Sequence, residues 1–193
     1  TFKSNVHLYT VENQYIGTIN KGQTTVLTGT NGDDGYTTYG GITVRFPLNT
    51  IYHTNLVNGS NLISYDLMAQ QLRKVNQMYP SFTKLEVIGY TVEGRAIYAL
   101  KVGNGQREIV MDAALHGREY LTTNVLMEMI DEYTHAYARN SHYEGYAVKQ
   151  LLDKTSIWFI PMVNADGVSL VQNGVKSTSY GDLVTRINGS TNV

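Results

Sequence analysis

The chain has 193 residues, a length that corresponds to one or two domains. Hydrophobic residues make up 42% of it and charged residues 16%, so it can bury a core and carries too little charge to be disordered throughout. The net charge of -1 argues against the broad positive field with which proteins bind nucleic acids. No apolar run approaches the about 20 residues of a membrane-spanning helix. We therefore expect a soluble globular protein with no nucleic-acid partner and no membrane span.

The first 57 residues are typical of a small all-β domain. Short β-rich runs at 6–11, 15–19, 24–28, 36–39 and 42–46 are separated by turns of Gly, Asn and Asp. So many strands in so little chain predict a strongly bent barrel. The spacing of Ile16-Gly17, Lys21-Gly22 and the run 24–27 resembles bacterial SH3-like domains, which attach enzymes to the cell wall. We place this domain at 1–57 and a second domain at 58–193.

From Ser64 the apolar residues recur with a period of about 3.6, which predicts a helix that begins after this residue and ends before Pro80. Two strands, 85–92 and 96–102, are joined by a tight turn, and a long helix is expected from residue 121. Strands at 108–115 and 156–163 are apolar enough to be covered on both faces, and a short helix is expected near 144–153. This order predicts a three-layer α/β sandwich with a mixed sheet. The segment 172–193 shows no period and is expected to be a loop.

The sequence His116-Gly117-Arg118-Glu119 follows a predicted buried strand and precedes a helix, which is where open α/β sheets place their sites. With no cysteine in the chain, a metal ion must be held by His and carboxylates. His116 and Glu119 can converge on one zinc ion from a tight turn. Alternatively, His116 simply ends the strand and Glu119 neutralises the helix N-terminus. The four residues alone leave both interpretations open.

The order of motifs between 64 and 167 resembles the M14 zinc carboxypeptidase family. It is carried by Tyr79-Pro80, by Ile88-Gly89-Tyr90 with Glu93-Gly94-Arg95, by residues 114–119, and by residues 161–167. The resemblance implies that His116 and Glu119 bind one zinc ion and that Arg118 lies near the substrate groove. In this family a glutamate activates a zinc-bound water, which attacks the scissile carbonyl.

In the family, the third ligand, the catalytic glutamate and a carboxylate clamp follow the last of these motifs. Nothing after Gly167 supplies them, and Arg186 does not match the clamp. We therefore expect the chain to be the N-terminal portion of a catalytic domain, inactive alone and with the C-terminal remainder as a partner. The glutamate that acts as general base is expected beyond Val193. The identity of the catalytic residues and the choice between endopeptidase and carboxypeptidase stay open.

The His-Gly-Arg-Glu and Asn-Ala-Asp-Gly forms resemble bacterial enzymes that cut γ-D-glutamyl-diamino acid bonds in peptidoglycan. We expect a peptide or a peptidoglycan stem peptide as substrate, and an extracellular or cell-wall location, with the cytoplasm as alternative. One alternative function is a non-catalytic protein that binds cell wall or glycans on a partial peptidase fold. Another is a general metallocarboxypeptidase that releases C-terminal residues and whose N-terminal domain is a blocking pro-segment.

Other polar and aromatic residues are given lesser roles. We expect Asn164 and Asp166 to shape a loop. His135 and His142 are expected at the surface near a helix C-terminus rather than in a second metal site. His7 and His53 are assigned no role. The tyrosines of the first domain either pack on strands or form a glycan- or peptide-binding surface: Tyr9, Tyr15, Tyr36, Tyr39 and Tyr52.

Overall fold

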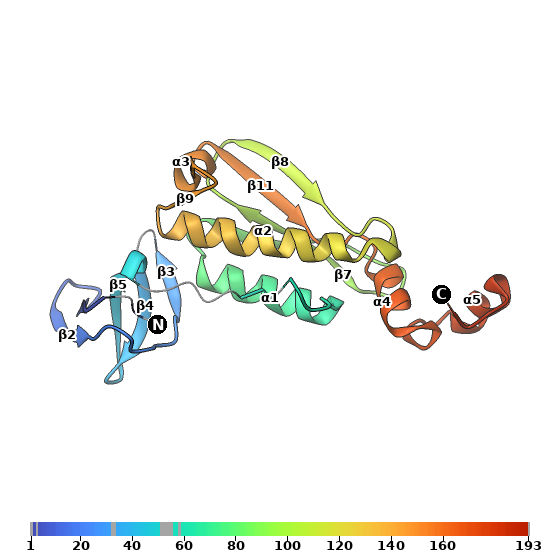
Figure 1. The fold of residues 1–193 in the computed structure, drawn as a ribbon, viewed down its shortest axis with the longest axis horizontal. Coiled ribbons are helices and arrows are strands. Elements are labelled where there is room, and N and C mark those ends of the chain that lie inside the picture. Colours follow the sequence, from blue (N-terminus) through green and yellow to red (C-terminus); the bar gives the residue numbers. More distant parts are fainter. Residues whose placement is uncertain (1, 3, 32–33, 51–55, 58, 193) are drawn as a thin grey trace.

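A computed structural model describes residues 2, 4–31, 34–50, 56–57 and 59–192. A five-stranded sheet lies at one end of an elongated molecule, a four-stranded sheet with its helices forms the middle, and the last helix lies at the other end (Figure 1). Tyr52, His53 and Val193, to which the sequence analysis refers, lie outside the described residues. The expectation that the general base lies beyond Val193 stays a prediction.

The N-terminal sheet is antiparallel, with the order β2-β1-β5-β4-β3. Its strands are β1 (Val6–Tyr9), β2 (Tyr15–Ile19), β3 (Gly29–Asn31), β4 (Asp34–Tyr39) and β5 (Ile42–Pro47), followed by the 3-10 helix η1 (Leu48–Thr50). It buries a small core of its own: Phe2, Val6, Leu8, Ile19, Val44 and Phe46. The sheet is strongly curved. Its strands β2 and β4 are not neighbours, yet a Cβ on Gly17 of β2 would lie 3.7 Å from the ring of Tyr39 at the end of β4.

The predicted strand at 24–28 is wrong. This segment is irregular and runs beside the sheet, held by the Thr37 hydroxyl, which donates to the carbonyl of Val26 at 2.8 Å. Side-chain bonds of this kind compete with ladder pairing, so the strand begins only at Gly29. The SH3-like class and the boundary at residue 57 stay predictions.

The first long helix forms as its period predicts. In α1 (Tyr65–Met78), the Ser64 hydroxyl accepts a hydrogen bond from the amide of Leu67 at 3.2 Å and caps the N-terminus. Met68, Leu72 and Val75 recur on one face and are buried. The apolar stripe therefore faces the main core.

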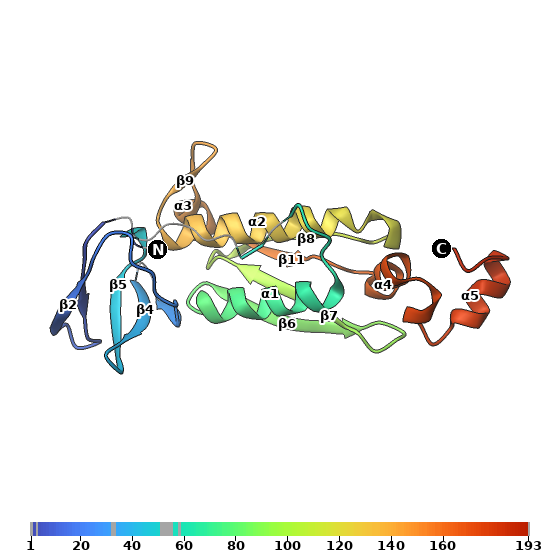
Figure 2. The same ribbon diagram turned by 60° about the horizontal axis from the view of Figure 1, so that its bottom comes forward.

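The second sheet is mixed, as predicted. Its strands are β6 (Thr83–Tyr90), β7 (Ala96–Val102), β8 (Arg107–Asp112) and β11 (Thr155–Ile160), in the order β6-β7-β11-β8. The pairs β6–β7 and β7–β11 are antiparallel, and β8–β11 is parallel. Helices α1 and α2 (Leu121–Ala138) lie along the sheet (Figure 2).

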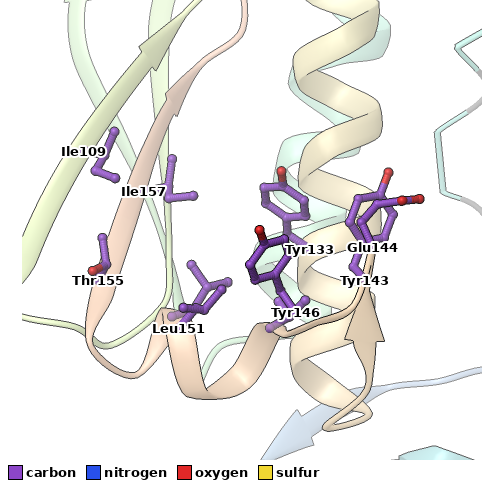
Figure 3. Close-up of a pocket in the computed structure, with 10 residues that line it drawn as sticks. Ile109, Tyr133, Tyr143, Glu144, Tyr146, Leu151, Thr155 and Ile157 are labelled. Atoms are coloured by element: carbon purple, nitrogen blue, oxygen red, sulfur yellow. The ribbon is translucent and has the colours of Figure 1, made fainter.

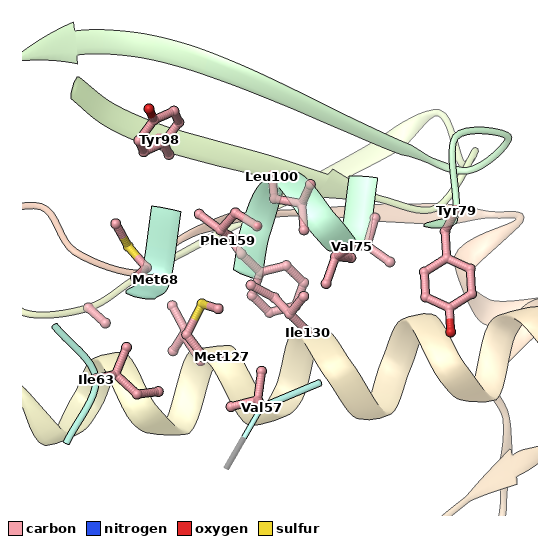
Figure 4. Packing of buried hydrophobic residues seen from close by; sticks show 14 of the residues in the cluster. Val57, Ile63, Met68, Val75, Tyr79, Tyr98, Leu100, Met127, Ile130 and Phe159 are labelled. Carbon is pink, nitrogen blue, oxygen red and sulfur yellow. The ribbon is translucent and has the colours of Figure 1, made fainter. Parts of the chain in front are cut away.

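The main core lies between these two helices and one face of the sheet. Leu100 of β7 and Phe159 of β11 pack against Val75 of α1 and against Met127 and Ile130 of α2 (Figure 4). Each of these five side chains is fully buried. Burial of a side chain of this size contributes about 1.5–3 kcal/mol, so this layer is the main source of stability.

The expected third layer is not found among the described residues. On the sheet face away from the core, Lys101 lies over the Trp158 ring at 5.7 Å and pairs with Glu108 at 2.6 Å. The strand expected at 108–115 forms as β8, but the expectation that it is covered on both faces is wrong. Its residues Ile109 and Val110 are 49% and 62% exposed. An apolar run predicts burial, but β8 is an edge strand here, and the chain beyond β11 continues past the strand ends rather than back across the sheet.

Two further segments differ from the expectation. The region 144–153 begins with a hairpin, β9 (His142–Tyr143) and β10 (Tyr146–Ala147), before the short helix α3 (Val148–Leu152). The positive φ angles of Glu144 and Gly145 form the hairpin turn, which the apolar pattern does not reveal. The segment expected to be a loop contains the end of α4 (Ala165–Asn173), a 3-10 turn η3 (Val175–Ser177) and α5 (Gly181–Asn188). No helix in the described ranges has the length and apolarity to cross a membrane.

Candidate metal centre

The segment that carries the candidate ligands is fixed at the carboxyl ends of two parallel strands. Beyond β8, the amide of Ala113 donates to the carbonyl of Ile160 at 3.0 Å, and the carbonyls of Ala113 and Ala114 accept from the amides of Val163 and Asn164, each at 3.0 Å. Ala114 has φ +50°, a left-handed conformation that is rare for residues other than Gly. Such strain persists only where surrounding bonds fix the backbone, and it is concentrated at functional sites.

His116 and Glu119 are brought together by the 3-10 turn η2 (Gly117–Glu119). The amide of Glu119 donates to the carbonyl of His116 at 3.1 Å, which closes the turn. As a result, His116 Nδ1 and Glu119 Oε1 lie 3.0 Å apart, and the side chains are 73% and 57% exposed. Zinc bonds to imidazole nitrogen and carboxylate oxygen measure about 2.0–2.2 Å, so two donors at this separation fit around one ion.

This pair does not complete a zinc site alone. Among the residues that the structure describes, no third His, Asp or Glu joins His116 and Glu119. Catalytic zinc normally takes three protein ligands and a water. The arrangement therefore provides two candidate ligands, and their role as ligands stays a prediction.

The turn packs directly on the start of α4. A Cβ on Gly117 would lie 2.4 Å from the carbonyl carbon of Gly167, so only glycine fits at this contact. The position of Gly167 is fixed in turn by Asn164, whose side-chain oxygen accepts from the Gly167 amide at 2.9 Å and caps α4. Asn164 therefore has the structural role that the sequence predicts.

Asp166 connects the same helix end to the β6–β7 turn. Its carboxylate accepts hydrogen bonds from the Thr91 hydroxyl at 2.8 Å, the Glu93 amide at 3.0 Å and Arg95 Nη1 at 2.6 Å. Burial alone would raise the pKa of Asp166, but the bonds from Glu93, Arg95 and Thr91 outweigh it and lower this pKa below its usual value. The sequence predicts a loop-shaping role for Asp166 but gives no indication of its ion pair with Arg95.

Glu93 extends this network to the C-terminal segment. Its carboxylate accepts from the Thr178 hydroxyl at 2.6 Å and from the Ser179 hydroxyl at 2.9 Å, and these bonds lower the pKa of Glu93. Arg95 also donates to the carbonyl of Ser177 at 3.1 Å. The turn that joins β6 to β7 thus holds both the start of α4 and the segment that precedes α5.

Arg118 is exposed beside the candidate ligands. It lines a groove of about 400 Å³ together with Gly167, Leu170 and Ile187. It forms no ion pair with any residue that the structure describes, so its charge is available to a ligand. A substrate-binding role for Arg118 stays a prediction. Arg186, which the sequence does not match to a clamp, is an exposed residue of α5.

An apolar cavity of about 500 Å³ lies at the opposite end of the sheet (Figure 3). The side chains of Tyr133, Tyr143 and Tyr146 face Ile109 of β8 and Ile157 of β11 across it. These strand positions lie near the amino ends of β8 and β11, whereas His116 follows the carboxyl end of β8. The cavity is therefore separate from the candidate metal centre.

The other histidines that the structure describes lie away from the metal centre. His135 is in the last turn of α2, where its Nε2 accepts from Arg139 at 2.7 Å, and His142 is exposed on β9. His7 lies edge-to-face with Tyr15, with ring centres 5.5 Å apart.

Among the tyrosines of the first domain, Tyr15 is 58% exposed and also contacts Tyr9 edge-to-face at 6.0 Å. Tyr9 in turn lies beneath the guanidinium of Arg45 at 5.7 Å. Tyr36 is half-buried and Tyr39 is 42% exposed. Tyr9 and Tyr15 therefore pack on each other, while Tyr15 and Tyr39 remain accessible, and the roles of these rings stay a prediction.

The chain is similar both to a protein named as an endopeptidase and to proteins named as carboxypeptidases. The chain is 34% identical over 119 residues to gamma-D-glutamyl-L-diamino acid endopeptidase 1 of Lysinibacillus sphaericus. This match covers 62% of this chain and 30% of that protein. It is 38% identical over 91 residues to human carboxypeptidase B, covering 46% of this chain and 21% of that protein. The chain thus spans less than a third of these relatives.

The fold is shared with solved structures. Thrombin-activatable fibrinolysis inhibitor superposes with a TM-score of 0.54 at 18% identity, over 63% of this chain and 30% of that one. The family model for the zinc carboxypeptidases, Peptidase_M14, matches residues 68–192. This match includes the His116–Glu119 turn and the three other motifs on which the resemblance rests. The chain therefore belongs to the M14 family of zinc carboxypeptidases.

Proposed function

We propose that this protein contributes the first two zinc ligands, His116 and Glu119, to a peptidase that hydrolyses bacterial cell-wall peptides. The observation that carries the proposal is the 3.0 Å separation of His116 Nδ1 and Glu119 Oε1 beyond the carboxyl end of β8, in a chain of the M14 family. The third ligand and the general base are proposed to lie beyond Val193.

Each residue of the centre has a defined task. His116 and Glu119 hold the ion, and Gly117 allows the turn to pack against Gly167, which fixes the ligand positions. When bound, zinc lowers the pKa of a coordinated water and polarises the substrate carbonyl. Arg118, exposed and without an ion pair in the described part of the chain, binds an anionic group of the substrate.

The substrate class is γ-D-glutamyl-diamino acid bonds of peptidoglycan stem peptides. The proposal is supported by the 34% identity to an endopeptidase named for this bond. A wall-binding N-terminal domain raises the effective concentration of such a substrate by tethering the enzyme to it. The corresponding location is extracellular or in the cell wall.

A second candidate is release of C-terminal residues from ordinary peptides. It is favoured by the 38% identity to human carboxypeptidase B. The two candidates share the ligands and differ in the residues that bind the peptide on either side of the cleaved bond. They are therefore distinguished by substrates rather than by metal content.

The test uses the longer polypeptide that contains this chain and the proposed third ligand. Elemental analysis by mass spectrometry should find about one zinc ion per polypeptide, and His116→Ala should remove it. His142→Ala, which changes an exposed histidine on β9, should leave the zinc in place. The cell-wall proposal further requires cleavage of a γ-D-glutamyl-diaminopimelate peptide. Zinc retained in His116→Ala contradicts the ligand assignment, and hydrolysis of C-terminal residues alone contradicts the substrate.

A further inference from the structure

One edge of the second sheet is formed by a strand with the apolar character of an interior strand. β8 pairs with β11 at each of its six residues, Arg107–Asp112, and no described strand pairs with its other side. Side chains alternate along a strand, so Ile109 and Val110 point to opposite faces of the sheet. They are 49% and 62% exposed. Both faces of β8 therefore leave apolar surface uncovered beside a free edge.

The opposite edge of the sheet differs in a way that shows what is unusual about β8. In β6, the pairing with β7 shifts between Val87 and Gly89, and such a bulge interrupts an edge and protects it from pairing with another strand. The pairing of β8 with β11 is regular over its whole length, and its residues 109–111 are apolar. A regular apolar strand with a free edge is a template for one more strand.

The apolar cavity of Figure 3 is the open flank of the main core. It is lined by Ile109 and its partner Ile157, which lies two residues before Phe159 and therefore on the same face of the sheet as the core. Val148 and Leu152 also line it, and both are buried members of the main core. The cavity thus lies where the core layer would continue across β8, and an apolar segment placed there would extend that core.

We propose that the polypeptide that follows Val193 adds a strand to the free edge of β8 and fills the apolar cavity with its side chains. The inference rests on the proposed function, in which the same polypeptide supplies the third zinc ligand. The matched relatives are long enough for this, because the aligned part is 30% of the endopeptidase and 30% of the solved inhibitor structure. Attachment to this chain gives such a segment a high effective concentration, which favours it over a second copy.

The position of β8 explains how this contact would serve the metal centre. The chain leaves the carboxyl end of β8 and reaches His116 four residues later, and β11 already occupies one side of β8. A strand paired with the free side lies about 4.8 Å from β8 and runs to the same end of the sheet. It can therefore bring a further donor beside His116 and Glu119 while its other end covers the cavity.

The test measures thiol labelling in the longer polypeptide that contains this chain. The 193 residues include no cysteine, so Ile109→Cys places a thiol at a defined point of β8. Val87→Cys on β6 is the matched control, because Val87 is 46% exposed and Ile109 is 49% exposed. Mass spectrometry of the peptides gives the rate of maleimide labelling at each position. Labelling of Ile109→Cys should be at least tenfold slower than that of Val87→Cys, at every protein concentration.

Two measurements identify the occupant and avoid dependence on one variant. A photoreactive benzoylphenylalanine in place of Tyr146, which lines the cavity and is 66% exposed, should cross-link to a peptide beyond Val193. Hydrogen exchange of the unsubstituted polypeptide should protect all amides of 107–112, whereas 83–90 keeps a rapidly exchanging fraction, because alternate amides of an edge strand face solvent.

Other results overturn the proposal. Equal labelling rates, or a rapidly exchanging fraction in 107–112, show that the edge of β8 stays free. Protection that is lost on dilution, or a cross-link to a peptide within 1–193, shows a different occupant. These measurements use neither zinc nor a peptide substrate. A polypeptide that covers β8 but binds no zinc would therefore refute the proposed function and leave this contact standing.

Discussion

Asp166→Asn tests whether the β6–β7 turn holds the end of α4 in place. The wild-type carboxylate accepts three hydrogen bonds, from Thr91, Glu93 and Arg95. Asparagine removes the charge and turns one acceptor oxygen into an NH2 group that faces a donor. Hydrogen bonds to charged groups contribute about 1.5–3 kcal/mol each, and the partial exposure of the site reduces this, so we expect a loss of about 3 kcal/mol.

For a chain of this length, that loss corresponds to a decrease in Tm of about 9 °C. Asp182→Asn is the matched control, because Asp182 occupies the same second position of α5 that Asp166 occupies in α4. The control keeps the helix-dipole contribution comparable and removes no hydrogen bond that the described structure shows. It should change the free energy of unfolding by less than about 0.5 kcal/mol.

The pH dependence of the free energy of unfolding tests the same role of Asp166. The pKa of Asp166 is lower in the folded chain than the about 3.9 of an unfolded aspartate. Its ionised form therefore contributes its full stability above about pH 4, and this contribution is lost as the pH falls through the folded-state pKa. Urea unfolding from pH 7 to pH 3 should show the difference between wild type and Asp166→Asn shrinking at the acid end. A difference that is absent at pH 7, or matched by Asp182→Asn, refutes the assigned role.

Two other positions have expected effects that urea unfolding measures. Gly117→Ala places a methyl group against the backbone of Gly167 and should lower the free energy of unfolding by about 1–3 kcal/mol. Gly29→Ala, with open space at its Cβ, should lower it by less than about 1 kcal/mol. Equal losses would contradict the close contact. Ser64→Ala removes the N-cap of α1 and should cost about 1 kcal/mol, and Ser64→Asp should restore most of it, since Asp caps as well; no recovery would contradict a capping role.

Features that depend on neighbouring residues could be predicted from the sequence. The period after Ser64 predicts α1 because helical burial repeats within the segment itself. The approach of His116 to Glu119 could likewise be expected, since the two residues are three apart in one turn. Both follow from backbone geometry over a single turn and need no knowledge of the rest of the fold.

Features that depend on distant partners could not be predicted. The apolar run of β8 indicates burial, but its exposure depends on whether another element covers Ile109 and Val110. The ion pair of Arg95 with Asp166 joins residues on the β6–β7 turn and on α4, and their meeting depends on the register of a hairpin and the direction of a helix. The helix α5 is a different case, because Leu183, Val184 and Ile187 do recur at helical spacing, and the expectation of a loop overlooked this short pattern.

The motif residues without an evident chemical role are the ones that fix the candidate ligands. Asn164 caps α4 and positions Gly167, and Gly167 is the surface against which Gly117 packs. Asp166 ties the same helix end to Arg95 in the β6–β7 turn. A metal site requires its donors to be held within a fraction of an ångström, and an exposed turn cannot supply that rigidity by itself. His116 and Glu119 meet within one turn, but the position of that turn depends on three chain segments together, so loosening any one of them should weaken metal binding before it unfolds the chain.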